Sequence, residues 1–124
     1  MITNFKFIHK KFKLNGVHYT KDDLLQVAYN FIKEGELFEQ EIGNFLMFWL
    51  DDNDTLEVKT SGSTGIPKAI KIKKQAMVNS ALATGAFFNL KPGDKALHCL
   101  PTQFIAGKMM LVRAIILGLE IDLV

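Results

Sequence analysis

Between residues 55 and 124 the chain alternates short strand patterns with longer helix patterns, and this alternation limits its possible folds more than any other feature. The strand patterns cover 56–60, 69–73, 96–100 and 119–124, and the helix patterns cover 75–88 and 104–117. Residues 69–73 alternate strictly between apolar and charged side chains, as in a strand with one face in water. Strands that are connected through helices by short links are parallel and are covered by those helices. The sequence therefore predicts an α/β fold, with these strands in one mainly parallel or mixed sheet flanked by helices.

Residues 1–54 have a different pattern, a hairpin followed by two helices, and we interpret them as a lead-in to the α/β segment 55–124. Asn15-Gly16 separates two short apolar runs, and this dipeptide tolerates the positive φ angles of a tight hairpin turn. Thr20 is a candidate N-cap for the first helix, which is expected to end near Gly35. The chain stops inside its last strand pattern, and a parallel sheet without its covering helix is incomplete. We therefore expect both segments to be parts of one larger domain, truncated at residue 124.

Composition and charge argue against several classes of protein. Lysine and arginine exceed aspartate and glutamate by only two, which is too small an excess to indicate a nucleic-acid partner. The single cysteine, Cys99, excludes an internal disulfide and indicates a reducing compartment. No apolar run approaches the roughly 18 residues of a membrane helix, and no two of the three histidines have metal-ligand spacing. We expect a cytoplasmic protein without a nucleic-acid or membrane partner and without a metal site of its own, in which His98 and Cys99 lie in a buried strand.

Residues 60–68, Thr-Ser-Gly-Ser-Thr-Gly-Ile-Pro-Lys, form the strongest functional motif of the chain. Glycine lets backbone N–H groups approach oxygen atoms closely, hydroxyl groups add donors and lysine adds positive charge, which together suit a phosphate. The positions of Gly62 and Gly65 fit neither a Walker loop nor the dinucleotide-binding fingerprint. Spacing alone therefore leaves two alternatives, a phosphate site and a flexible connector between two strands.

This nine-residue motif resembles, without a departure, the signature loop of the adenylate-forming superfamily, which includes acyl-CoA synthetases, nonribosomal-peptide adenylation domains and luciferases. A second segment, Leu100–Gly107, is similar to the family's Leu-Pro-x-x-(His or aromatic)-x-x-Gly motif. Phe104 occupies the ring position, so the proton chemistry of a histidine is not implied here. The resemblance covers residues 56–124 and implies the N-terminal portion of the large domain of an adenylate-forming enzyme. It also implies that the loop binds the phosphates of ATP through Thr60, Ser61, Gly62, Ser63, Thr64, Gly65 and Lys68.

Within this family, the stretch Phe104–Arg113 most resembles o-succinylbenzoate–CoA ligases of menaquinone biosynthesis. The resemblance implies that the substrate is bound by Phe104, Ala106, Gly107 and Arg113, and that the arginine holds a substrate carboxylate. The helical neighbours of Arg113 are apolar, and an arginine in such a place needs a partner because it does not lose its charge. A structural ion pair with Asp122, or a side chain that extends to solvent, is the alternative.

The resemblance implies an ATP-dependent acid–CoA ligase, in which a carboxylate attacks the α-phosphate of ATP and CoA then displaces AMP. ATP, Mg²⁺, CoA and a small carboxylic acid would be its cofactor and substrates, and the adenine, ribose and metal sites would lie downstream of residue 124. We therefore expect no complete catalytic set in these residues, and no activity from the 124 residues alone. We also expect the 60–68 loop to be exposed and poorly ordered without nucleotide. Another acyl- or aryl-CoA ligase and a non-catalytic truncated remnant are the alternative interpretations.

Overall fold

The computed structural model describes residues 3–60, 65–66 and 68–124, and these residues form the α/β arrangement that the sequence predicts. The helices are α1 (Lys21–Glu34), α2 (Leu37–Trp49), α3 (Lys74–Phe87) and α4 (Ile105–Leu117). The strands are β1 (Lys13–Leu14), β2 (Thr55–Thr60), β3 (Lys68–Lys73), β4 (Lys95–His98) and β5 (Glu120–Leu123). The ends of α3 and α4 lie within one residue of those predicted, because apolar periodicity and turn residues are local signals.

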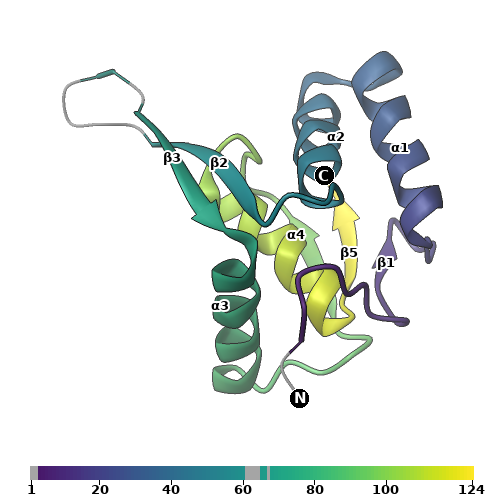
Figure 1. Cartoon of the computed structure of the whole chain (residues 1–124). Coiled ribbons are helices and arrows are strands. Elements are labelled where there is room, and N and C mark those ends of the chain that lie inside the picture. The colour runs from purple at the N-terminus through teal and green to yellow at the C-terminus, as the bar shows by residue number, and fades with distance from the viewer. Residues whose placement is uncertain (1–2, 61–64, 67) are drawn as a thin grey trace.

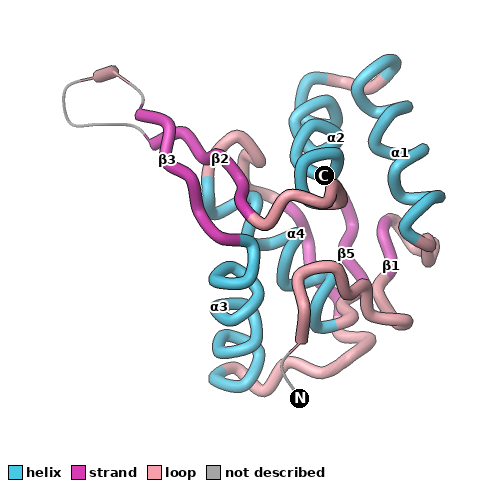
Figure 2. Tube along the Cα trace, in the orientation of Figure 1, coloured by secondary structure: helices cyan, strands magenta, loops and turns pink. Residues whose placement is uncertain are grey.

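The expectation of a single sheet is wrong, because the described strands form two sheets. Strands β1, β5 and β4 form a parallel sheet in that order, whereas β2 and β3 form a separate antiparallel hairpin. Strand β2 ends at Thr60 and β3 begins at Lys68, so the connection is shorter than the dozen or so residues that a parallel crossover needs, and strands joined in this way pair antiparallel. The rule that a helix connects parallel strands applies to β4, α4 and β5. Figures 1 and 2 show the hairpin projecting away from α1 and α2.

The turn at Asn15-Gly16 forms as predicted, with φ angles of 50° and 82°. The hairpin that it was expected to close is limited to one bridge between Leu14 and Val17. Strand β1 pairs instead with β5, and the side chain of Asn15 accepts a hydrogen bond from the backbone N–H of Leu123 at 2.8 Å. The first and last strands of the chain are therefore held together by the turn.

Helices α1 and α2 pack against each other, and α3 packs against α4. Thr20 caps α1 as predicted, since its side chain accepts a hydrogen bond from the backbone N–H of Asp23. Buried side chains from the lead-in and from the α/β segment form one hydrophobic core, whose largest members include Phe12, Trp49, Leu111, Ile115 and Ile121. None of the described helices is long and apolar enough to cross a membrane.

A buried lysine fixes the base of the hairpin to the N-terminal segment. The side chain of Lys74, at the junction of β3 and α3, is fully buried, and its Nζ lies 2.7 Å from Oδ1 of Asp51. The same nitrogen lies 5.5 Å from the centre of the Phe5 ring, and Gln75 donates a hydrogen bond to the carbonyl of Thr3. Burial raises the pKa of Asp51, but hydrogen bonds from Lys74 and Asn53 outweigh it and bring the pKa below its usual value. These contacts fix where the hairpin leaves the core.

Candidate functional site

The two ends of the 60–68 loop lie opposite each other across the hairpin, because Thr60 pairs with Lys68 in the β2–β3 ladder. This end of the hairpin points away from the helices (Figure 1). Lys68 is exposed, and Gly65 is exposed with a φ of 78°, a conformation that favours glycine. Ser61 to Thr64, which include most of the predicted phosphate donors, lie outside the described residues. The prediction that the loop is poorly ordered also concerns these residues. The described part therefore presents Gly65 and Lys68 on the surface.

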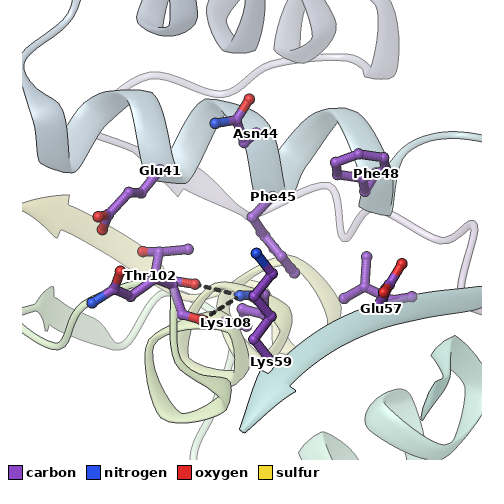
Figure 3. A pocket seen from close by; sticks show the side chains of 10 residues that line it. Glu41, Asn44, Phe45, Phe48, Glu57, Lys59, Thr102 and Lys108 are labelled. Atoms are coloured by element: carbon purple, nitrogen blue, oxygen red, sulfur yellow. Dashed lines mark hydrogen bonds between the residues drawn. The ribbon is translucent and has the colours of Figure 1, made fainter. Parts of the chain in front are cut away.

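A cavity of about 470 Å³ lies between α2, β2 and the turn that precedes α4 (Figure 3), and we call it the α2–β2 cavity. Charged, amide and aromatic side chains line it together. Helix α2 contributes Glu41, Asn44, Phe45 and Phe48; strand β2 contributes Leu56, Glu57 and Lys59; the turn and α4 contribute Thr102, Gln103 and Lys108. Its volume is within the range of small-molecule sites.

A second cavity, of about 340 Å³, lies between the hairpin and the start of α4, and we call it the α4 cavity. Its lining is apolar except for Lys59, and it consists of Val58, Lys59, Ile70, Ile72, Phe104, Ile105 and Ala106. Phe104 and Ala106, two of the residues implied to bind the substrate, are thus brought together beside β2. This strand leads into residues 60–68, which we call the phosphate-loop motif. Lys59 lines both cavities and directly precedes that motif.

A buried histidine fixes the turn between β4 and α4. Nε2 of His98 lies 3.0 Å from Oγ1 of Thr102 and 3.1 Å from the carbonyl oxygen of Gly107. Burial lowers the pKa of His98, although hydrogen bonds to backbone carbonyls act against this. His98 is buried as expected, but the expectation for Cys99 is wrong, because its side chain is exposed just after β4 ends. The histidine therefore has a structural position beside the Phe104 turn.

Two further residues determine the shape of this turn. Lys108 donates hydrogen bonds to the carbonyl oxygens of Thr102 at 2.7 Å and Gln103 at 3.0 Å. Gly107 is buried, and a Cβ atom there would overlap the carbonyl oxygen of Pro101. Gly107 thus allows the close approach of α4 to the turn. Gly107 was also predicted to bind the substrate, but it lines neither cavity.

Arg113 lies on α4 away from the residues with which it was expected to act. It is half-buried, and burial lowers its pKa. It lines neither the α2–β2 cavity nor the α4 cavity, and no described acid, Asp122 included, lies within ion-pair distance of it. The structure therefore brings Phe104 and Ala106 together but not Arg113.

Sequence reasoning did not identify the residues of α2 that line a cavity, or the roles of Lys59 and Lys108. Phe45 is buried in the core, whereas Phe48 is 61% exposed. Lys59 directly precedes the 60–68 motif, and this position could have marked it as a candidate site residue. No group of three His, Cys, Asp or Glu side chains that could hold a metal ion occurs in the described ranges of the chain.

The sequence of the chain is similar to that of a known family and of two known proteins. The family described as AMP-binding enzyme matches residues 58–124. The nonribosomal peptide synthetase gliP of Aspergillus fumigatus is 42% identical over 52 residues, which are 42% of this chain and 2% of gliP. The nonribosomal peptide synthetase vlms of Lecanicillium sp is 33% identical over 67 residues, which are 54% of this chain and 1% of vlms. These curated relatives are thus far longer than the chain.

A solved structure is also similar over most of the chain. It is the acyl-CoA synthetase (AMP-forming)/AMP-acid ligase II-like protein from Dyadobacter fermentans, with a TM-score of 0.69 and 33% sequence identity. The match covers 80% of this chain and 28% of the Dyadobacter chain. The arrangement of helices and strands described above is therefore similar to a part of that larger protein.

Proposed function

Since the chain belongs to the AMP-binding enzyme family, we propose that it forms part of an enzyme that activates a carboxylic acid with ATP, forming an acyl-adenylate and releasing pyrophosphate. The observation that carries this proposal is the position of the 60–68 motif. Its ends, Thr60 and Lys68, are paired at the exposed end of the hairpin, and β2 also lines the α4 cavity. A phosphate site and an apolar acid pocket would thus be adjacent.

In this reaction an oxygen of the acid attacks the α-phosphate of ATP, and the bond to pyrophosphate breaks. Negative charge gathers on phosphate oxygens, so positioned donors and cations stabilise the transition state more than a base does. In our proposal Lys68 supplies positive charge, and Gly65 allows the backbone to turn towards the phosphates. The other phosphate contacts come from Thr60, Ser61, Gly62, Ser63 and Thr64.

The acid would lie in the α4 cavity, with its apolar body against Phe104 and Ala106, while Gly107 shapes the adjoining turn. We propose o-succinylbenzoate as the acid and the thiol of CoA as the acceptor of the acyl group, in a cytoplasmic reaction of menaquinone biosynthesis. This substrate has two carboxylates, and adenylation uses only one. Arg113 does not line the α4 cavity, but it lies on the same helix as Ala106 and is half-buried without an acidic partner among the described residues. This favours it as the partner of the second carboxylate.

The test begins with the gene. Its nucleotide sequence beyond codon 124 shows whether the reading frame continues, and the resulting polypeptide is then assayed for ATP–pyrophosphate exchange. The assay uses o-succinylbenzoate, benzoate and octanoate in parallel. We expect exchange with o-succinylbenzoate from the longer polypeptide and none from the 124-residue chain, which matches 28% of the similar Dyadobacter chain.

Each other result favours a different interpretation. Exchange with benzoate or octanoate instead of o-succinylbenzoate favours another acyl- or aryl-CoA ligase. A reading frame that stops at codon 124, together with no exchange, favours a non-catalytic remnant and overturns the proposal. Exchange by the 124 residues alone would contradict the expectation that they hold an incomplete site.

A further inference from the structure

The α2–β2 cavity contains two lysines to which the proposed function gives no role. Lys108 directs two of its three N–H donors to the carbonyl oxygens of Thr102 and Gln103, which fixes its ammonium group, and no other described residue accepts a hydrogen bond from it. Burial lowers the pKa of Lys108, whereas the charge of Glu41 raises it. The side chain of Lys59, also in the lining, forms no ion pair with any described residue. The cavity therefore offers N–H donors and positive charge to a ligand.

Two aromatic rings line the same cavity from α2. Phe45 is buried and stacks on Trp49 with ring centres 5.9 Å apart, so the position of its ring is fixed. The side chain of Phe48 is 61% exposed, and it borders the cavity instead of the core. A flat apolar group in the cavity would cover this ring and gain the free energy of removing apolar surface from water.

Two carboxylates restrict the charge of a ligand. Glu41 and Glu57 lie on opposite sides of the cavity in Figure 3, and neither is within ion-pair distance of Lys59 or Lys108 in the described structure. The formal charges of these four side chains sum to zero. An anionic ligand is attracted by the two lysines and repelled by the two acids, so its negative charge must lie nearer the ammonium groups. A single compact carboxylate meets this condition more easily than pyrophosphate, whose charges are spread over a longer group.

We propose that the α2–β2 cavity binds a small aromatic monocarboxylate, with its carboxylate at Lys59 and Lys108 and its ring against Phe45 and Phe48. A carboxylate accepts charge-assisted hydrogen bonds from ammonium groups, and such bonds are stronger than neutral ones. The cavity volume of about 470 Å³ has room for a bicyclic aromatic acid. This site shares Lys59 with the α4 cavity, but its other lining residues differ from those of that cavity, and it does not depend on adenylate formation.

The experiment is a titration of the ¹⁵N-labelled 124-residue chain with 2-naphthoate, followed by NMR. We expect saturable shifts of the Asn44, Phe45, Phe48 and Gln103 amides, and a Kd for the neutral analogue 2-naphthamide that is about tenfold higher. Lys59→Met should raise the Kd of 2-naphthoate about tenfold without changing that of 2-naphthamide. Phe48→Ala should raise the Kd of both compounds. Lys91→Met, at an exposed lysine in the turn before β4, is the matched control and should leave both constants unchanged.

Three results would overturn the proposal. The first is equal affinity for 2-naphthoate and 2-naphthamide, and the second is an unchanged Kd in a folded Lys59→Met variant. The third is a set of shifts confined to the α4 cavity, at Phe104 to Ala106. Displacement of 2-naphthoate by an equal concentration of pyrophosphate would also contradict the charge argument. None of these results bears on ATP–pyrophosphate exchange, so this proposal and the proposed function fail separately.

Discussion

Nε2 of His98 lies 3.0 Å from Oγ1 of Thr102, and both side chains are buried. The same nitrogen lies 3.1 Å from the carbonyl oxygen of Gly107. A carbonyl oxygen only accepts hydrogen bonds, so this arrangement assigns a proton to Nε2. One imidazole thus links β4, the turn that contains Thr102 and the first turn of α4, and it sets the position of the Phe104 segment.

This link predicts a pH dependence of stability. Burial lowers the pKa of His98 below its usual 6.5. As the pH falls, His98 is therefore protonated in the unfolded chain before it is protonated in the folded chain. The free energy of unfolding should therefore fall as the pH decreases below 6.5 and be unaffected by this group above it. The slope contributed by one such histidine is at most about 1.4 kcal/mol per pH unit. Urea unfolding between pH 5 and 8 measures it.

His98→Gln should reduce this slope. His9 provides the comparison, because burial and the charges of Lys10 and Lys11 lower its pKa as well. His9→Gln should remove a separate part of the slope. A His98→Gln variant that keeps the slope of the original chain would show that His98 does not carry it.

Gly107→Ala should lower the free energy of unfolding by about 1–3 kcal/mol, as expected when a buried site is overpacked. The new Cβ would overlap the carbonyl oxygen of Pro101, which is backbone and does not rotate away. Chemical denaturation measures the change. Ala106→Ser, at the exposed neighbouring position, is the control and should change the stability by less than about 0.5 kcal/mol. Equal stabilities of the two variants would contradict the close approach.

Asp51→Asn should destabilise the chain by about 1–3 kcal/mol, because it leaves the buried ammonium of Lys74 without its counter-charge. The upper part of the usual range for a buried pair is not expected, since the side chain of Asp51 is 33% exposed. Asp52→Asn is the matched control. Asp52 is 85% exposed and lies 3.5 Å from Lys6, so its loss should cost less than about 0.5 kcal/mol. Thermal and urea unfolding measure the stability of both variants. Equal losses of stability would argue against a stabilising pair between Lys74 and Asp51.

Lys68→Ala should weaken the binding of pyrophosphate to the chain about tenfold, because it removes the cation at the end of the phosphate-loop motif. Binding should also weaken between 20 and 200 mM salt, since Lys68 is exposed. Isothermal titration calorimetry or NMR measures both effects. Lys71→Ala, at an exposed lysine in the middle of β3, controls for general charge and should have a smaller effect. The same loss in both variants would indicate non-specific attraction.

Arg113→Ala should raise the KM for o-succinylbenzoate at least tenfold, or about 1.4 kcal/mol, in the active polypeptide that contains these residues. The KM for ATP should be nearly unchanged, because the expected contact is to the second carboxylate of the acid. Arg113→Lys should restore part of the loss, since an ammonium group does not form the bidentate contact. Equal losses of acid and ATP affinity would make Arg113 a structural residue.

Features that depend on neighbouring residues could be read from the sequence. The Thr20 cap, the positive φ angles at Asn15-Gly16 and the extents of α3 and α4 agree with their sequence signals, because their hydrogen bonds and dihedral angles are local. The nine-residue motif 60–68 and the Leu100–Gly107 segment indicated the family for the same reason. The family signal there lies in contiguous residues, so no knowledge of the fold is needed.

Features that depend on distant contacts were decided by the tertiary structure. The alternating pattern of Ala69–Lys73 predicts a strand but not its partner, and β3 pairs with β2 outside the main sheet. Likewise, nothing near Lys13 indicates a parallel pairing with Glu120. The cavities follow from such contacts, since packing of α2 beside β2 brings Phe48 and Lys108 to one surface and leaves Arg113 elsewhere. Local hydrogen bonds and side-chain periodicity depend on residues that are adjacent in the sequence. Strand partners and cavity walls depend on which surfaces, distant in the sequence, pack against each other and exclude water.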